Sequence, residues 1–219
     1  MPRPGTAAIC ALLAIACGAV PRALPGPADA APAGPRTIVD EWTAAKAPPA
    51  PPLKPVTADP GTTAFLILDV QRQNCASRPR CAATVPRIAA LLARATAAGV
   101  LVVYSVFPGG HVDDILPEVR PLPGQPLVAA GPDKFLNTNL DAVLRGRSIK
   151  TVIVSGTAAN GAVLATSSEA AERGFAVAVP LDLMSAEALY AEQYTAWHLS
   201  HAPVISPHIT LTRSDLIRF

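Results

Sequence analysis

Three groups of residues could carry out chemistry, and each follows an apolar, strand-like segment. Asp69 ends the run TTAFLILDV, where a buried carboxylate is costly unless it has a partner. It is therefore either a cap for the next turn or a general acid or base held by a nearby cation. Lys134, in the loop GPDK, could supply that cation, although taken alone it fits a solvated lysine. The turn SGTAANGA (155–162) would let a ligand approach backbone N–H groups, or it reflects only close packing.

Two cysteines lie close together just after Asp69. Cys75 and Cys81 bracket the short loop CASRPRC, and such an even pair in an exported protein predicts a disulfide. Closing so short a loop stabilises the fold by about 2 kcal/mol. The alternative is two free thiols, with Cys75 as a nucleophile, but a disulfide would remove the thiolate that attack requires.

Metal and cofactor sites are not expected. His111 follows a Gly pair, and His198 and His201 stand at helical spacing, without the carboxylate and cysteine neighbours of a metal site. His198 is better explained as a packed or interfacial residue. The GTAANGA turn is not a dinucleotide fingerprint, and there is no phosphate loop.

The N-terminus has the features of a targeting segment. Residues 1–30 contain the apolar stretch Ala7 to Val20, too short to span a bilayer, and then the small-x-small site at 28–30. We therefore predict a signal peptide and an exported protein, either periplasmic or secreted. A competing interpretation is a lipoprotein box ending at Cys17, although its first position lacks the usual leucine.

A proline-rich arm is predicted at residues 31–61. Thirteen of the 24 prolines fall within the first 60 residues, and 44–56 is typical of an extended polyproline segment. This arm could wrap the domain or a neighbouring subunit. The net charge of +2 provides no electrostatic footprint for nucleic acid, so a small-molecule or protein partner is expected.

From residue 62 onward, strand-like and helix-like segments alternate. Together they predict a doubly wound, mostly parallel α/β sheet with helices on both faces, formed by residues 62–219. In such a sheet, ligands bind beyond the carboxyl ends of the strands. The predicted strands are at 62–69, 100–107, 127–128, 151–156, 175–180 and 208–212. The predicted helices are at 85–99, 137–144, 161–173 and 186–199.

Two segments resemble the isochorismatase-like (cysteine hydrolase) family. FLILDVQRQ matches the family's apolar strand followed by D-x-Q, and VIVSGTAANGAVLATSSEAAERGFAVAVPLD matches its strand, turn, A-x-x-A-x-x-R-G helix and following strand. The resemblance runs from about Thr62 to the C-terminus. It implies a six-stranded parallel sheet, an Asp–Lys–Cys triad, a cis peptide bond before the nucleophile, here at Thr157–Ala158, and a homo-oligomer.

The resemblance also assigns catalytic positions. Asp69 takes the aspartate position, whereas the nucleophilic cysteine position falls on Ala162, whose methyl group cannot attack. True isochorismatases carry glycine there and use the aspartate as an acid while water attacks. For Lys134, either the loop before FLNTNL is shortened or the lysine role is lost, and we favour the shortened loop. The assigned substrate-binding residues are Gln71, Thr157, Ala158 and Gly161.

These observations lead to three functional hypotheses. The first is a hydrolase of a small metabolite of amide, carbamoyl or vinyl-ether type, in which water replaces cysteine as the nucleophile. The second is a degenerate family member that binds a small ligand without turnover. The third is an oligomeric structural protein whose proline arm exchanges between subunits.

Overall fold

The computed structural model describes residues 34–219. The predicted signal peptide, its cleavage site at 28–30, the lipidation site at Cys17 and the first residues of the arm lie outside this described part. The chain divides into two compact units, Met1–Ala47 and Pro48–Phe219. Within residues 34–219, every helix is too short or too polar to cross a bilayer.

A seven-stranded sheet forms the centre of the second unit. Its strands follow the order β4-β3-β2-β5-β6-β8, with β7 paired to β5, and every pair is parallel. All six predicted strands are present in this sheet, to which β7 is the one addition, so the predicted parallel fold is confirmed. The strands are β2 (Thr63–Leu68), β3 (Leu101–Val106), β4 (Leu127–Ala129), β5 (Thr151–Thr157), β6 (Ala176–Pro180), β7 (Met184–Ser185) and β8 (Ile209–Thr212).

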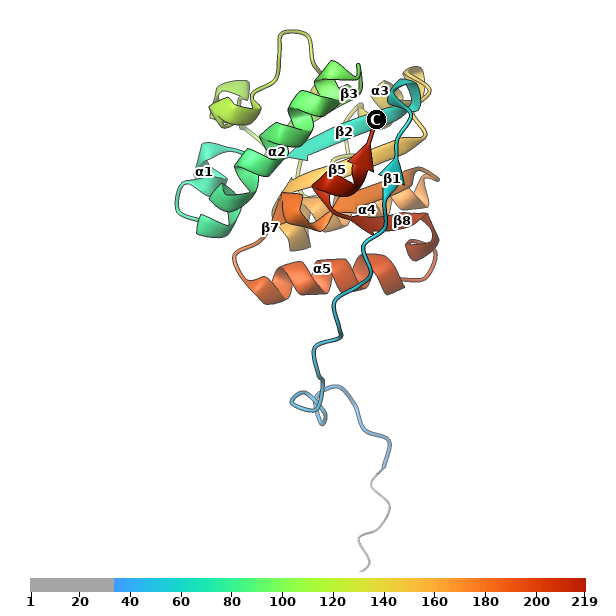
Figure 1. Ribbon diagram of the computed structural model, residues 1–219. Coiled ribbons are helices and arrows are strands. Elements are labelled where there is room, and N and C mark those ends of the chain that lie inside the picture. The colour runs from blue at the N-terminus through green and yellow to red at the C-terminus, as the bar shows by residue number, and fades with distance from the viewer. Residues whose placement is uncertain (1–33) are drawn as a thin grey trace, which may run out of the picture. The chain divides into compact units, whose positions relative to one another are not determined.

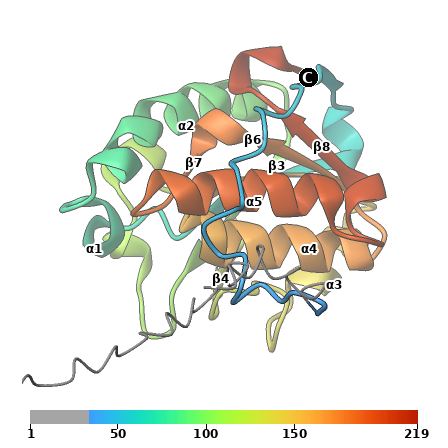
Figure 2. The same ribbon diagram turned by 90° about the horizontal axis from the view of Figure 1, so that it is seen from below.

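Helices cover both faces of this sheet (Figures 1 and 2). On one face, α2 buries a stripe at helical spacing that runs from Cys81 to Ala95. On the other, buried residues of α3, α4 and α5 pack against the opposite side chains of the same strands. The helices are α1 (Arg72–Cys75), α2 (Pro79–Ala97), α3 (Leu140–Gly146), α4 (Leu164–Glu172) and α5 (Leu189–His201).

The predicted start of α2 at Val85 was wrong. The helix begins at Pro79 and continues through Pro86. Proline is favoured in the first turn of a helix, so Pro86 and Pro79 each resemble a start in the sequence. The earlier start prevails because it also buries Cys81 against the core.

The other helices differ from prediction at their ends. α3 begins at Leu140 after Asn139, because Asn137 adopts a left-handed conformation with φ of 57° that cannot belong to the helix. A π-helical turn at Ala159–Val163 precedes α4, where a continuous helix from Gly161 was predicted. α5 begins and ends later than the predicted 186–199.

The compact unit begins earlier than the predicted domain boundary at residue 62. Strand β1 (Val56–Thr57) pairs in parallel with β9 (Ile217–Arg218). The Lys54 N–H donates to the Leu211 carbonyl at 2.9 Å, which joins the end of the proline-rich segment to β8. These bonds attach residues 54–57 to the compact unit, which begins at Pro48.

Tyr104 in β3 predicts how stability depends on alkaline pH. The side chain is 1% exposed, and burial raises its pKa to about 12, against about 10 in an unfolded chain. Above pH ~10 the unfolded chain therefore releases a proton that the folded chain keeps, and the free energy of unfolding falls by about 1.4 kcal/mol per pH unit. Urea unfolding at pH 9–11 should show this fall in the wild type relative to Tyr104→Phe. Equal slopes would contradict the prediction.

Candidate active site

Asp69 lies directly after β2, at the carboxyl edge of the sheet. Its backbone is left-handed, with φ of 54°, a conformation uncommon for residues other than glycine. Two donors hold its carbonyl oxygen: the Gln71 N–H at 2.8 Å and the Asn74 side-chain amide at 2.8 Å. Because of this turn, the Asp69 side chain does not continue the alternation of side chains between the two faces of the sheet. The residue is 8% exposed.

The Asp69 carboxylate and the Lys134 ammonium form a buried ion pair. Nζ lies 2.7 Å from Oδ2 and also donates to the Ala130 carbonyl at 3.0 Å. Lys134 is fully buried, whereas the Asp69 side chain keeps 11% of its surface exposed. The two residues therefore meet as the predicted acid–cation pair requires, with only the carboxylate open to solvent.

The segment that carries Lys134 is fixed at both sides. The Lys134 N–H donates to the Thr166 hydroxyl on α4 at 3.3 Å, and the Thr138 hydroxyl donates to the Lys134 carbonyl at 2.6 Å. These bonds place the ammonium at Asp69 even though the lysine is close to FLNTNL in sequence. The shortened loop before FLNTNL stays a prediction.

Ser105 in β3 is a site residue that the sequence did not indicate. Its hydroxyl donates to Asp69 Oδ1 at 2.7 Å, so each carboxylate oxygen has a protein donor. Ser105 is 1% exposed and pairs in register with Leu68. A polar residue within VLVVYSVF was the available signal, and only the strand register shows what it faces.

The turn after β5 brings small residues against the same edge. Gly156 has φ of 121°, and a Cβ there would lie 2.0 Å from the Leu68 carbonyl oxygen. The Thr157–Ala158 peptide bond is cis, as expected. Thr157 uses its hydroxyl to bind the Ser185 carbonyl at 3.2 Å. Ala162, 4% exposed, lies in the π-helical turn that follows.

One backbone donor of this turn already has a hydrogen-bond partner within the protein. The Gly161 N–H donates to the Ala158 carbonyl at 2.9 Å, and the Val163 N–H shares that acceptor at 3.2 Å. The Gly161 N–H is therefore occupied rather than free for a substrate oxygen. A sequence of small residues shows that backbone can be approached but not which N–H groups remain unbonded.

Gln71 is completely buried beside Asp69. Its Oε1 accepts the Phe107 N–H at 3.1 Å, which fastens the segment after β3 to the site. Its Nε2 has no hydrogen-bond partner within residues 34–219 and lies under Gly110, where a Cβ would approach it to 2.7 Å. The Gln71 side chain therefore holds the segment after β3 in place through Oε1, whereas its Nε2 donor is unpaired within the described residues.

The predicted disulfide between Cys75 and Cys81 is present. Both residues are buried, at the junction of α1 and α2. His198 and His201 lie on α5, where their rings contact Tyr194 and Trp197. No group of three or more metal-ligating side chains occurs among residues 34–219.

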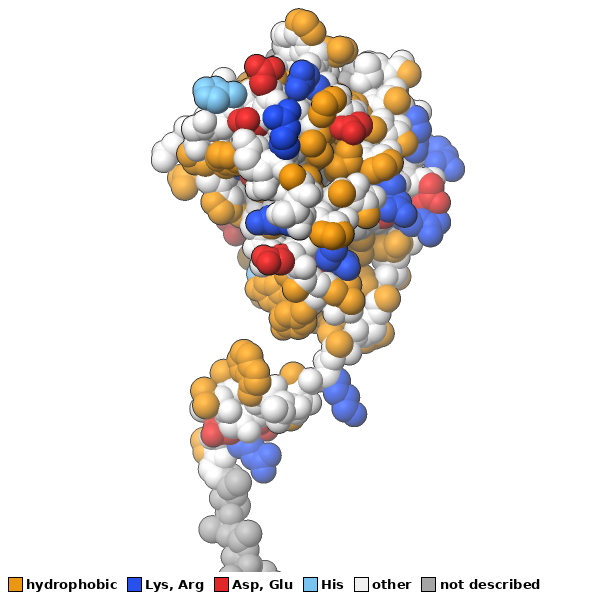
Figure 3. Space-filling view, turned by 90° about the vertical axis from the view of Figure 1, so that its left-hand side faces the viewer, with side chains coloured by type: hydrophobic (Ala, Val, Ile, Leu, Met, Phe, Trp, Pro, Cys, Tyr) orange, Lys and Arg blue, Asp and Glu red, His pale blue; other side chains and the backbone are white. Residues whose placement is uncertain are grey.

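The surface around the site carries mixed charge. Figure 3 shows the face that includes α1, on which basic, acidic and hydrophobic side chains are interspersed. A groove of about 660 Å³ lies apart from the ion pair, between Pro48–Pro52, α5 and β8. Asp69 and Lys134 do not line this groove, so it is separate from the candidate active site.

Residues 63–207 match the family description "Isochorismatase domain", and this match covers well over half of the chain. The chain belongs to the isochorismatase family. The match spans the entire set of elements that build the site, from β2 to α5. No curated protein matches the chain.

Several solved structures share this fold. A cysteine hydrolase from Pseudomonas syringae pv. phaseolicola has a TM-score of 0.64 and 23% identity, over 76% of this chain and 95% of its own. N-carbamoylsarcosine amidase from Thermoplasma acidophilum gives 0.61 and 23%, over 70% and 97%. A nicotinamidase from Staphylococcus aureus gives 0.58 and 18%, over 64% and 92%. At these identities the likeness shows the fold.

Proposed function

We propose that this isochorismatase-family protein hydrolyses a small metabolite of the amide, carbamoyl or vinyl-ether type, with water as the nucleophile. The observation that carries the proposal is the buried Asp69–Lys134 pair at 2.7 Å, whose carboxylate alone reaches the surface. A buried ion pair is weak evidence for stability, because desolvation offsets much of the attraction. An acid–cation pair at the ligand-binding edge of an α/β sheet is instead well suited to proton transfer.

Water is proposed as the nucleophile because no free thiol lies in the described domain. Within residues 34–219 the cysteines are Cys75 and Cys81, and they are bonded to each other. The family resemblance places the nucleophilic cysteine at Ala162, in the π-helical turn beside the cis peptide bond. Covalent thiol catalysis is therefore replaced, in this proposal, by direct attack of water.

The residues take the following roles. Asp69 exchanges a proton with the attacking water or the leaving group, and a positioned acid or base of this kind contributes roughly 10²–10⁴-fold to rate. Lys134 compensates the carboxylate charge, and Ser105 fixes Oδ1 so that the carboxyl group keeps one orientation. Because the Gly161 N–H is occupied, any oxyanion contact in this turn falls to other backbone N–H groups.

A second candidate is a ligand-binding protein without turnover. Ala162 favours it, since a methyl group at the family's nucleophile position is the expected mark of lost catalysis. In that case the ion pair would maintain the shape of a binding site, and a ligand would bind without being cleaved.

The deciding experiment measures turnover of a panel of small amides, carbamoyl compounds and vinyl ethers. We expect at least one substrate to be cleaved, and Asp69→Asn to reduce that rate by about 10²-fold or more. Asp113→Asn is the matched control, because Asp113 is exposed and its carboxylate makes no hydrogen bond within the described residues. Equal loss in both variants would contradict the role of Asp69, and ligand binding without cleavage would favour the second candidate.

We further propose that the protein works outside the cytoplasm. The Cys75–Cys81 disulfide supports this, because such bonds persist mainly in oxidising compartments.

A further inference from the structure

The disulfide and the candidate acid are connected through a single side chain. Asn74 donates its amide N–H to the Asp69 carbonyl at 2.8 Å, and it is followed directly by Cys75, whose sulfur is bonded to Cys81. Asn74 belongs to α1, a helix of only four residues between the catalytic turn and α2. A single residue, Asn74, thus links the disulfide to the backbone of Asp69.

This path matters because the Asp69 turn needs outside support. Its left-handed backbone is uncommon for a residue with a side chain. A four-residue helix is also too short to be stable alone, since helix nucleation is unfavourable. The position of Asn74 therefore depends on what anchors α1, and the covalent anchor at its C-terminal end is the bond to Cys81 in the first turn of α2.

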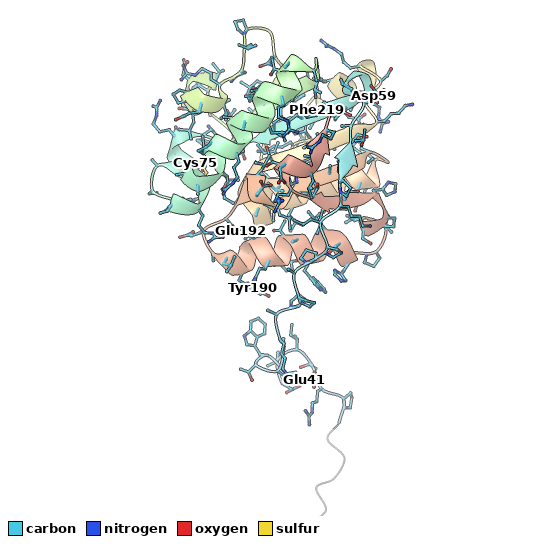
Figure 4. The ribbon with its side chains drawn as sticks, in the orientation of Figure 1. Glu41, Asp59, Cys75, Tyr190, Glu192 and Phe219 are labelled. Atoms are coloured by element: carbon cyan, nitrogen blue, oxygen red, sulfur yellow. A yellow bond between two sulfur atoms is a disulfide. The ribbon has the colours of Figure 1, made fainter. Side chains whose placement is uncertain are left out.

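The far side of the disulfide is itself firmly held. Cys81 lies in the first turn of α2, on the buried face of that helix, and is 1% exposed. Next to it, Arg80 pairs with Glu192 on α5, and Glu192 also accepts the Ala186 N–H at 2.9 Å. Figure 4 shows Cys75 and Glu192 at the same end of the domain, with Asp59 at the opposite end. The anchor is thus tied to two helices.

We propose that Asn74 is a positioning residue for Asp69 and that the Cys75–Cys81 disulfide is what keeps Asn74 in place. The candidate active site is then complete only in the oxidised protein. This inference rests on the proposed function for its effect on turnover, but its structural part concerns the Asp69–Lys134 ion pair and can be measured without a substrate.

The structural test follows the Lys134 ammonium by ¹⁵N NMR of the full chain, with the resonance assigned by its loss in Lys134→Met. A fully buried, ion-paired ammonium should exchange slowly and give a resolved signal. Asn74→Ala should broaden or shift it, because Asp69 then loses a carbonyl contact and its carboxylate reorients. Gln73→Ala is the matched control on the same helix, since Gln73 bonds outward to Asp114 and should leave the signal unchanged. An unchanged signal in Asn74→Ala would overturn the proposal.

The disulfide is tested by reduction and by substitution. A dithiol reductant transfers two electrons and two protons, so that the S–S bond breaks, Cys75 and Cys81 become thiols, and the reductant becomes a disulfide. Reduced wild type and the Cys75→Ser/Cys81→Ser variant should both show the altered Lys134 signal. In an Asn74→Ala background, reduction should change the signal little further, because the connecting side chain is already absent. An equal further change would show that the disulfide acts by another route.

With a substrate from the panel, kcat should fall about 10²-fold in Asn74→Ala and on reduction, with KM nearly unchanged, as expected for a misplacement of about 1 Å. Gln73→Ala should retain its rate. If no substrate is turned over but the Lys134 signal responds as described, the proposed function fails and the positioning role stands. If turnover is found and neither Asn74→Ala nor reduction affects kcat or the signal, the positioning role fails alone.

Discussion

Lys134→Met is expected to lower the free energy of unfolding by about 3–5 kcal/mol, because it leaves the Asp69 carboxylate buried without its cation. The loss arises from the unpaired charge rather than from missing volume, since methionine fills most of the space of the lysine chain. Ser105 still donates to Oδ1. Urea unfolding with an unchanged m-value would measure the loss directly.

Two comparisons separate this effect from others. Lys150→Met changes the same residue type at an exposed position and should alter stability by less than about 0.5 kcal/mol. The double variant Asp69→Asn/Lys134→Met should be more stable than the sum of the single losses predicts, because contacting residues are not additive. Strict additivity would mean that the two groups do not interact in solution.

Gly156→Ala is expected to cost about 4 kcal/mol or more, combining backbone strain with overpacking. Its φ of 121° is unfavourable for any residue with a Cβ, and that atom would lie 2.0 Å from the Leu68 carbonyl oxygen. Because the obstacle is backbone of the neighbouring strand, no side chain can rotate away. We expect a sharp fall in Tm or a failure to accumulate folded protein.

Gly99→Ala is the matched control for this substitution. Gly99 also has positive φ, 77°, but a Cβ there meets nothing within 4 Å. Its cost should be confined to backbone strain, about 1–2 kcal/mol. If Gly156→Ala cost no more than Gly99→Ala, the close approach of β5 to Leu68 would not hold in solution.

Much of the fold could be predicted from sequence because its strands are buried on both faces. Such strands are continuous apolar runs, and TTAFLILDV and TVIVSG stand out for that reason. Asp69 was identifiable because a carboxylate at the end of such an apolar run is costly to bury without a partner. The short strands β1, β7 and β9 were missed, since two residues carry no periodicity and their pairing depends on distant partners.

The candidate site was predicted less completely than the fold. Ser105 resembles an ordinary buried serine until the register of β2 and β3 places it beside Asp69. Asn74 resembles a loop residue until the left-handed turn brings the Asp69 carbonyl to its amide. Gly161 was assigned to substrate binding because it lies in a turn of small residues, but sequence does not show which backbone donors of that turn are already hydrogen-bonded. In each case the missing information is a hydrogen bond that only the folded conformation of the chain defines.

The pairing of β1 with β9 has a mechanical consequence. The two strands are parallel, so tension applied between Pro48 and Phe219 would pull them past each other along their length. The hydrogen bonds between them, together with the bond from the Ala58 N–H to the Arg218 carbonyl, would then share the load and rupture together rather than opening in succession. The unit should therefore resist stretching from its two ends more strongly than the shortness of these strands suggests.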